Sequence, residues 1–348
     1  MKLTKQTIEK LHTTQNLSDE EFLALLAADE WDSLLFTHAD QVRREVYGDA
    51  VYVRGLIEFC NICQNNCYYC GIRAANTGLS RYHLSKQEIL SCCEEGYHLG
   101  MRTFVLQSGE NSFYPDELIC DIVAEIKSNY PDCAVTLSIG EKSRESYQAY
   151  YDAGATRYLL RHEAASEDLY HSLHPDSMSL KARKQCLFDL KDIGYQVGAG
   201  FMVGAPFQTL ADLVTDLRFL QQLDPDMIGI GPYLTHAQTP FHTHPNGSLT
   251  LTLRLLAILR LMFPHALLPA TTALATISED GRKRGLKAGA NVVMPNLSPV
   301  SKRQLYSIYE NKKHTGTESA RCIDELRIQI SNTGYRMVTD IGNVKRPL

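Results

Sequence analysis

The sequence lacks both a long apolar run and a strong excess of charge of either sign. No stretch approaches the roughly 18 consecutive apolar residues of a membrane-spanning helix, and residues 1–15 lack the apolar centre of a secretory signal. Lysine and arginine number 35 against 40 aspartate and glutamate residues, so the formal net charge is −5. This balance excludes a general attraction to nucleic acid or to anionic membranes. We therefore expect small-molecule ligands and a cytoplasmic location.

Low-complexity tracts and linkers are also missing, which argues against a disordered chain. Of the 348 residues, 44% are apolar, enough for a large buried core. Ten cysteines are present, but thiols in a cytoplasmic protein stay reduced and rarely form a disulfide framework. Clustered cysteines in that setting usually bind metal or take part in redox chemistry.

Short apolar runs alternate with helix-sized amphipathic segments from Val51 onward. Eight such runs predict an α/β fold, a complete (βα)8 barrel of the TIM type, with a doubly wound open sheet as the alternative. The expected strands are Val51–Phe59, Thr103–Gln107, Ala134–Ser138, Arg157–Leu160, Gln196–Met202, Met227–Gly231, Leu267–Thr272 and Asn291–Met294. The expected helices are 85–99, 116–128, 143–153, 180–193, 209–223, 249–262 and 281–288.

Two further regions flank the predicted barrel, which is expected to occupy residues 49–300. Residues 1–48 predict a helical N-terminal extension, in which Ser18 and Glu21 form a capping box. Residues 301–348 are polar and predict a helical or loose C-terminal cap.

Four cysteines follow the first predicted strand, at the end of a barrel strand where catalytic residues gather. They are Cys60, Cys63, Cys67 and Cys70. Zinc is the less favoured ligand, because structural zinc sites usually separate their two cysteine pairs by roughly a dozen residues or more. As iron–sulfur ligands, Cys63, Cys67 and Cys70 supply three thiolates to a [4Fe–4S] cubane and leave one iron open for reaction. The gaps also differ from those of the bacterial ferredoxin motif, which makes simple electron transfer the weaker interpretation.

The spacing Cys-x3-Cys-x2-Cys, with Tyr69 before the last cysteine, resembles the signature of the radical S-adenosylmethionine (SAM) superfamily. The resemblance implies that SAM chelates the open iron and is cleaved to a 5′-deoxyadenosyl radical. The main role of the protein is then to position the reactants and to shield the radical. Cys60 is then interpreted as a spare buried thiol. A turn after the second strand matches the place where the superfamily commonly binds the SAM amino group. Its residues are Gln107, Ser108, Gly109 and Glu110.

Five motifs at separate strand ends closely resemble the HydE family, the radical SAM maturases of iron-iron hydrogenase. They are Ile57–Asn61, Leu106–Glu110, Arg157–Glu163, Pro269–Ala273 and Met294–Asn296, within a resemblance that covers roughly Gly48 to Tyr309. The resemblance implies SAM contacts at Tyr69, Gln107, Ser108, Gly109, Glu110, Ser138, Glu163 and Arg183. It implies a deeper substrate pocket at Arg157, Arg161, Thr271, Thr272, Met294 and Tyr306.

These residue types suit the implied ligands. Arg161 and Glu163 would be costly to bury unless they pair with each other or with a zwitterionic ligand, and Arg183 suits a carboxylate clamp. Arginines, hydroxyls and a tyrosine would orient an amino-acid group in the pocket, from which apolar side chains exclude water. Thr271 and Thr272 could equally be ordinary strand residues, since threonine favours sheets.

The resemblance also implies a substrate and partners. In the HydE family the substrate class is an iron complex that carries cysteine, carbon monoxide and cyanide, HydG and HydF are fellow maturases, and an external donor supplies one electron. HydE is grouped with biotin synthase and methylornithine synthase. Two alternatives stay open for this chain, a methylornithine-synthase-like amino-acid mutase and a nonenzymatic iron–sulfur binding protein.

The C-terminal region departs from the family pattern. Many HydE proteins carry three further cysteines there that hold an auxiliary cluster, but this sequence keeps only Cys322, with His314 and Glu325 at the other two positions. Histidine and glutamate are not the usual partners of cysteine in an iron–sulfur site. The sequence therefore predicts a single cubane.

Overall fold

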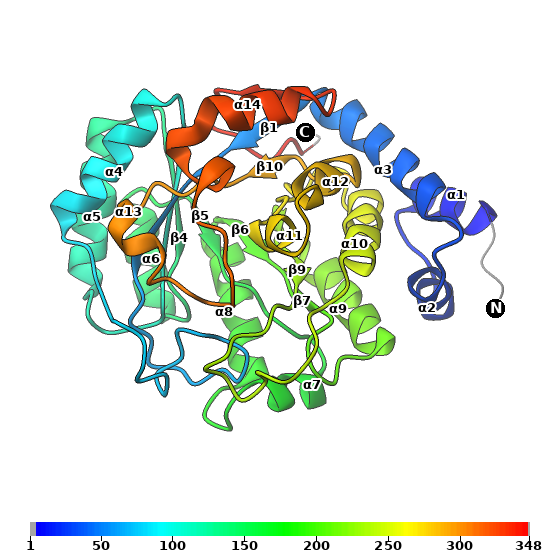
Figure 1. Ribbon diagram of the computed structural model, residues 1–348, viewed down its shortest axis with the longest axis horizontal. Coiled ribbons are helices and arrows are strands. Elements are labelled where there is room, and N and C mark those ends of the chain that lie inside the picture. Colours follow the sequence, from blue (N-terminus) through cyan, green and yellow to red (C-terminus); the bar gives the residue numbers. More distant parts are fainter. Residues whose placement is uncertain (1–4, 347–348) are drawn as a thin grey trace.

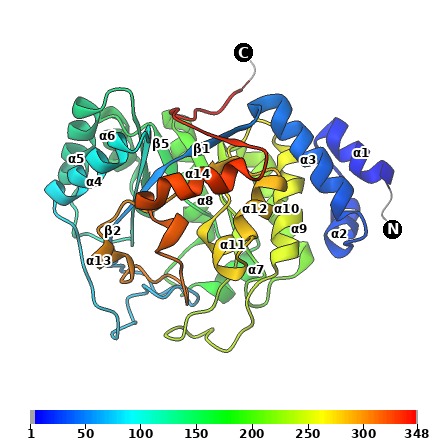
Figure 2. The same ribbon diagram turned by 45° about the horizontal axis from the view of Figure 1, so that its top comes forward.

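The computed structural model describes residues 5–346 and has a parallel β-sheet at its centre (Figures 1 and 2). A doubly wound sheet reverses its strand order at a switch point, whereas these six neighbours follow one another in chain order. The α/β class is therefore confirmed and the doubly wound alternative is disfavoured. The six strands are β2 (Gly55–Cys60), β3 (Thr103–Ser108), β4 (Ala134–Ser138), β5 (Arg157–Leu159), β6 (Gln196–Ala199) and β8 (Met227–Ile228).

Two smaller parallel sheets and several isolated bridges continue the pairing beyond this sheet. One contains β10 (Val292–Val293), β1 (Ala50–Val53) and β11 (Arg336–Val338), and the other β7 (Met202–Val203) and β9 (Gly231–Pro232). Parallel bridges join Met227 to Leu267, Pro269 to Val292, and Leu56 to Asn296. These contacts run from the β8 edge of the sheet towards the β2 edge.

Several predicted strands are shorter or more broken than expected. The first splits at Arg54 into β1 and β2, and the predicted strands that begin at Gln196 and Met227 each split into two. The expectation of a strand at Leu267–Thr272 was wrong: its first residues form only bridges, and Thr272 opens a helix, α11 (Thr272–Ile277).

Helices connect the strands, as parallel pairing requires. Capping boxes start two of them, at Ser85 with Glu88 and at Thr209 with Asp212. Gly194 ends a third in the left-handed region, at φ 107°. These helices are α4 (Lys86–His98), α5 (Asp116–Asn129), α6 (Arg144–Asp152), α7 (Glu167–Leu173), α8 (Leu180–Ile193), α9 (Leu210–Leu223), α10 (Leu249–Met262) and α12 (Gly281–Lys287).

The N-terminal segment is helical as predicted, with α1 (Lys5–Thr14), α2 (Asp19–Ala27) and α3 (Asp32–Tyr47). The capping box at Ser18 and Glu21 is confirmed. The helix α3 packs on α10, where Arg254 forms an ion pair with Asp32 at 2.6 Å. Residues 1–4 of the predicted extension lie outside the described residues.

The C-terminal segment is more firmly integrated than a loose cap. It contains α13 (Val300–Arg303), two 3-10 turns and α14 (Ile323–Ser331), and its strand β11 pairs with β1. Figure 1 shows α14 lying across the top of the view, beside β1 and β10. Among residues 5–346, no helix combines the length and the hydropathy needed to cross a membrane.

Candidate functional site

The loop that carries the clustered cysteines is held by an arginine clamp. The guanidinium of Arg81 donates hydrogen bonds to the backbone oxygens of Asn61 (2.6 Å), Ile72 (2.7 Å), Arg73 (2.6 Å) and Asn76 (3.1 Å). One side chain thus ties both ends and the middle of the loop together. The clamp sets the shape of the loop through backbone contacts alone.

Two glycines bring other segments against this loop. A Cβ atom on Gly109 would lie 2.3 Å from the Ile62 oxygen and 2.8 Å from the Cys63 Cβ, and one on Gly71 would lie 2.2 Å from the Ser307 oxygen. Any side chain at either position would force backbone apart. The turn after β3 therefore sits directly against the cysteine loop.

The thiols of Cys63, Cys67 and Cys70 are half-buried on this loop. Burial raises the pKa of all three, that of Cys67 to about 12, and for Cys67 and Cys70 neighbouring thiols add to the rise. Within residues 5–346, no three cysteine, histidine or acidic side chains converge on the point that one metal ion would occupy. A cubane makes a different demand, since each thiolate ligates a different iron. Three thiols on one loop meet that demand.

Cys60 has a different environment from the other three thiols. It is fully buried, and its sulfur accepts weak hydrogen bonds from the Ile62 N–H (3.4 Å) and the Asn111 side chain (3.8 Å). Burial raises its pKa to about 11. This environment favours a structural role.

Two carboxylates and Arg183 form a chain beside the loop. The Glu110 carboxylate accepts a hydrogen bond from the Glu141 N–H (2.8 Å), and the Glu141 carboxylate lies 3.0 Å from Nε of Arg183. Burial raises the pKa of Glu141, and although burial opposes the charge of Arg183, Glu141 and other anions raise the pKa of that guanidinium. Glu141 was not among the predicted site residues, yet it is the group that Arg183 contacts.

Arg161 and Glu163 lie beyond the end of β5. Nη2 of Arg161 is 3.1 Å from Oε2 of Glu163, but within the described chain neither atom makes a hydrogen bond, and Nε of Arg161 also has no partner. Glu163 has a positive φ of 65°, which is rare for a side chain of this size and is often found at functional sites. His162 points elsewhere, 3.2 Å from Asp216, in a fully buried pair. The ion pair of Arg161 and Glu163 presents one cation and one anion, and the unpaired Nε of Arg161 could donate to a zwitterionic ligand.

The phenol of Tyr69 is already engaged. Its oxygen lies 3.0 Å from Nε2 of His174, whose Nδ1 lies 2.9 Å from the Tyr170 oxygen. Because that carbonyl only accepts, Nδ1 carries the proton and Nε2 accepts from Tyr69. Any ligand contact of Tyr69 would use its backbone or the face of its ring.

The remaining predicted cofactor residues lie at the ends of β3 and β4. Gln107 and Ser138 are register partners on these neighbouring strands, so their side chains point to the same face. Ser108 donates to the oxygen of Gly109 (2.7 Å).

An interior polar cluster joins β2 to the C-terminal segment. The fully buried carboxylate of Glu58 accepts hydrogen bonds from Lys312 and from Asn296 (2.7 Å). Gln107 donates to the hydroxyl of Tyr306 (3.3 Å), whose ring centroid lies 5.3 Å from the Lys312 ammonium. The predicted Tyr306 thus belongs to a cluster whose charged members the sequence analysis missed.

The two predicted threonines have different surroundings. Thr272 donates to Glu318 (2.8 Å), which also pairs with Arg282. The Thr271 hydroxyl is buried and has no hydrogen-bond partner among residues 5–346. Met294 packs against the apolar cluster that contains Met227 and Leu267.

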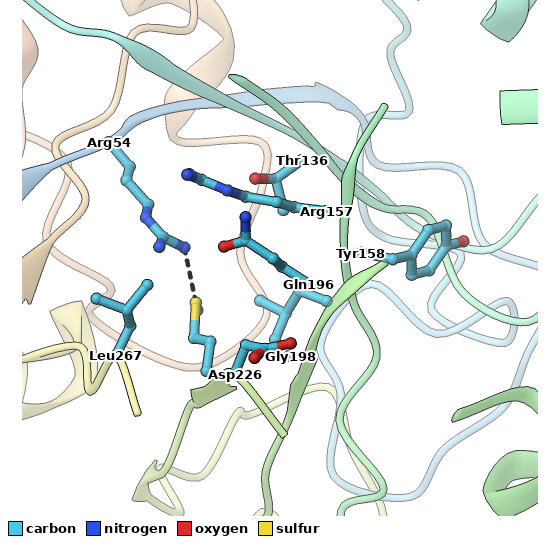
Figure 3. Close-up of a pocket in the computed structure, with 10 residues that line it drawn as sticks. Arg54, Thr136, Arg157, Tyr158, Gln196, Gly198, Asp226 and Leu267 are labelled. Atoms are coloured by element: carbon cyan, nitrogen blue, oxygen red, sulfur yellow. Dashed lines mark hydrogen bonds between the residues drawn. The ribbon is translucent and has the colours of Figure 1, made fainter. Parts of the chain in front are cut away.

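Arg157 lies apart from Arg161. It begins β5, about 13 Å along the chain from Arg161, and its guanidinium bonds Thr103 (2.9 Å) and Asn343 (2.7 Å). Arg157 and Arg54 line a small interior cavity near the amino ends of the strands (Figure 3). Burial lowers the pKa of Arg157 to about 10 and that of Arg54, with help from Arg157, to about 9.

The cavity contains unused hydrogen-bonding groups. Within the described part of the chain, Nε of Arg157, Nε and Nη2 of Arg54 and the Thr136 hydroxyl make no hydrogen bond. Arg54 reaches Sδ of Met227 at 2.8 Å, the contact drawn in Figure 3.

The C-terminal metal-ligand positions do not form a cluster. Cys322 precedes α14, the His314 ring bonds Gln304 and the Lys312 oxygen, and Glu325 is exposed. Across the described residues no grouping of these side chains could hold a metal ion.

Comparisons with known proteins agree on one family. The model of the radical SAM superfamily matches residues 57–220. The [FeFe] hydrogenase maturase subunit HydE of Thermotoga maritima is 43% identical over 343 residues, which cover 98% of each chain. The 3-methylornithine synthase of Methanosarcina acetivorans is 30% identical over 87% of this chain and 86% of its own.

Solved structures agree with the fold. The crystal structure of methylornithine synthase (PylB) superposes with a TM-score of 0.85 at 26% identity, covering 95% of this chain and 97% of that one. The maturase HydG superposes with a TM-score of 0.79 at 20% identity, over 96% of this chain and 75% of its own.

Proposed function

The chain belongs to the radical SAM superfamily and, within it, to the HydE family, and we propose that it acts as a radical SAM maturase in assembly of the active-site cluster of an [FeFe] hydrogenase. The observation that carries this function is 43% identity to a HydE maturase along 98% of both chains. The reaction then takes place at the inner face of the sheet. There the chain's own residues bind the cofactor and the substrate, orient them and exclude water.

Cys63, Cys67 and Cys70 are the residues that would hold the [4Fe–4S] cluster. When bound and reduced, this group supplies one electron for cleavage of SAM to methionine and a 5′-deoxyadenosyl radical. The Arg81 clamp and the close approach of Gly109 keep the three thiols in place.

The groups proposed to bind SAM are Tyr69, Gln107, Ser108, Gly109, Glu110, Ser138, Glu163 and Arg183. The support is electrostatic. Glu163 presents a carboxylate whose Oε2 lies 3.1 Å from Nη2 of Arg161, and this carboxylate can also receive the ammonium of an amino acid. Arg183 presents a buried guanidinium held by Glu141, and it can receive a carboxylate.

The proposed substrate site extends inward from Arg161, past Thr271, Thr272, Met294 and Tyr306, to the cavity at Arg157. Arg157 is buried and Arg161 is partly exposed, and each has an N–H group that makes no hydrogen bond among residues 5–346, which favours an electron-rich or anionic substrate. The proposed substrate is an iron complex that carries cysteine, carbon monoxide and cyanide, with HydG and HydF as fellow maturases and an external donor of one electron.

We also propose that the strands close into a complete eight-stranded barrel over residues 49–300, with the flanking segments 1–48 and 301–348 as separate regions. The support is the set of parallel bridges through Leu267, Pro269 and Asn296, which lie between the β8 and β2 edges. The splits at Arg54 and after Ala199 break the ladders into short pieces.

The function is tested by anaerobic reconstitution followed by maturation in vitro. The loaded protein should restore hydrogen production to a maturation mixture that contains HydF, HydG and apo-hydrogenase but no HydE. A Cys67→Ala variant should not. A methylornithine-synthase-like mutase is the second candidate, favoured by the TM-score of 0.85 to PylB. Formation of 3-methylornithine in place of maturation, followed by mass spectrometry, would identify that activity.

A further inference from the structure

Acidic residues are absent from the three sequence segments that surround the cysteine loop. Residues 59–87, 193–211 and 227–278 contain no aspartate or glutamate, although the whole chain has 40 of them and a net charge of −5. The first segment contains the cysteine loop itself with Arg73 and Arg81, and the third contains His236, His242 and His244. These three segments therefore carry no negative charge of their own, while carboxylates beside the cysteine loop, such as Glu110 and Glu163, come from other segments of the chain.

A connected set of aromatic rings leads from this loop to the surface. Tyr68 directly follows the ligand Cys67, and its ring centroid lies 6.0 Å from that of Phe241. The Phe241 ring lies 5.8 Å from that of Phe207. The guanidinium carbon of Arg73 lies 5.9 Å from the centroid of the Tyr68 ring.

Phe207 is unusual in exposure and in backbone conformation. It is 62% exposed, and its φ of 68° falls in the left-handed region that large side chains rarely adopt. The strain and the exposed ring both cost free energy in the isolated chain, and such features gather at binding surfaces. His244 lies 5.4 Å from the ring, so Phe207 is the exposed centre of an aromatic and weakly basic patch.

We propose that Phe207, Phe241, His242, His244 and Arg73 form the docking surface for an acidic one-electron carrier protein of the ferredoxin class. The inference rests on the proposed function, which requires an electron from outside. The reduced carrier loses one electron, and the group held by Cys63, Cys67 and Cys70 gains it. Docking here places the carrier two ring contacts from Tyr68, the neighbour of Cys67.

Charge complementarity selects this carrier over an apolar or basic partner. Complementary charge mainly raises the association rate, while a central aromatic side chain supplies binding energy. Acidic residues occur on neighbouring segments: the Glu310 carboxylate accepts from the Ala237 N–H (3.1 Å), and the exposed Asp176 lies on the loop whose Met178 contacts Cys67. Neither lies within the patch itself.

The test compares two surface variants with two matched controls in the cluster-loaded protein. Phe207→Asn removes the ring and keeps a residue that tolerates positive φ, and His242→Glu adds one negative charge to the patch. Ile328→Ser removes an apolar side chain that is 61% exposed on α14, and Gln329→Glu adds the same charge beside it. Figure 1 shows α14 and α7 at opposite edges of the molecule, and the patch lies on the α7 side.

A reduced acidic [4Fe–4S] ferredoxin is the probe, and cluster reduction is followed by rapid-mixing absorbance at low ionic strength. Phe207→Asn should lower the second-order rate constant roughly tenfold, the loss typical of a central aromatic contact. His242→Glu should lower it at low salt and recover towards wild type above about 0.1 M salt, where the Debye length is about 10 Å. Calorimetric binding of the oxidised ferredoxin should weaken in parallel.

Dithionite distinguishes failure of the docking surface from failure of the proposed function. With dithionite as the reductant, the cluster of all four variants should be reduced at the normal rate and SAM should be cleaved normally, because that reagent needs no docking surface. Unchanged ferredoxin rates in both surface variants, or an equal loss in both controls, would overturn the docking surface. A wild-type protein that takes electrons from ferredoxin but never cleaves SAM would instead overturn the proposed function.

Discussion

Single residues decide which thiols can hold the cluster. Cys63, Cys67 and Cys70 share one clamped loop, whereas Cys60 points into a fully buried site and is used by Ile62 and Asn111. Replacing any of the first three by alanine should abolish cluster binding, since two thiolates rarely retain a cubane. Cys60→Ala should keep its iron. Iron and sulfide measured after anaerobic reconstitution check this, and loss of iron in Cys60→Ala with retention in Cys63→Ala would reverse the ligand assignment.

Arg183 is the second residue for which we expect a specific effect. Arg183→Ala should weaken SAM binding about ten- to a hundredfold, because a hydrogen bond to a charged group contributes roughly 1.5 to 3 kcal/mol. The same change leaves the Glu141 carboxylate beside Glu110 without its cation. The double variant Arg183→Ala/Glu141→Gln therefore tests whether the loss of SAM affinity comes from a missing contact to SAM or from this unpaired carboxylate. Equilibrium dialysis measures the affinity. Lys181→Ala, an exposed change on the same helix, is the control.

His174 should make folding stability depend on pH. Burial lowers its pKa to about 4, against about 6.5 in an unfolded chain. A depressed histidine pKa means that stability is complete above about pH 6.5 and is lost as protons bind the unfolded state between there and pH 4. The contribution is about 3 kcal/mol at most. Chemical denaturation at several pH values should show that the free energy of unfolding falls less between about pH 6.5 and about pH 4 in His174→Gln than in the wild type. The exposed His171→Gln control should show the same pH dependence as the wild type.

At the scale of elements, the segment between α13 and α14 crosses the cysteine end of the sheet. Its Ile308 oxygen accepts from Gly71 (2.9 Å), its Ser307 contacts His236 (3.2 Å) and its Lys312 pairs with Glu58. The segment thereby connects the cysteine loop, the loop before α10 and β2. The buried ion pair is its firmest attachment.

Lys312→Met should therefore destabilise the protein by about 3 to 5 kcal/mol, because it leaves the Glu58 carboxylate buried without its cation. The double variant Lys312→Met/Glu58→Gln should recover part of that loss. Denaturant unfolding measures both changes, with exposed Lys313→Met as the control. Equal destabilisation by the single and double variants would show that packing, rather than charge, holds the segment.

Elements also show what the sequence could predict. Local signals were reliable: the capping box at Ser18 and the alternation of strands and helices were both found in the structure. The cysteine spacing was equally local, because Cys60 ends β2 and the other three thiols lie on the short loop that follows it. Glu58 and Lys312 were missed because they lie 254 residues apart and their pairing depends on tertiary structure. Arg157 and Arg161 were assigned to one pocket because they share a motif, and a motif does not show that Arg157 begins β5 and lines the interior cavity while Arg161 lies beyond the end of that strand.

For the whole molecule, the cysteine distribution predicts one cubane per chain. Past Cys186 the sequence contains only one further cysteine, Cys322, so a second cubane would lack thiolate ligands there. The reconstituted protein should bind roughly four irons, and Cys322→Ser should change neither iron content nor activity. Paramagnetic resonance of the reduced protein, with and without SAM, provides the second measurement. A SAM-insensitive signal that disappears in Cys322→Ser would contradict a single cluster.

The Arg81 clamp also affects how the iron-free protein takes up its cluster. Because one guanidinium binds four backbone carbonyls, we expect the loop to keep its conformation in the iron-free protein. Inserting the cluster then requires little ordering of the chain, in contrast to small metal-binding domains that fold only around their metal. Amide hydrogens in the loop should exchange slowly in the iron-free protein. We therefore expect a chain that has lost its cluster to accept a new one without refolding.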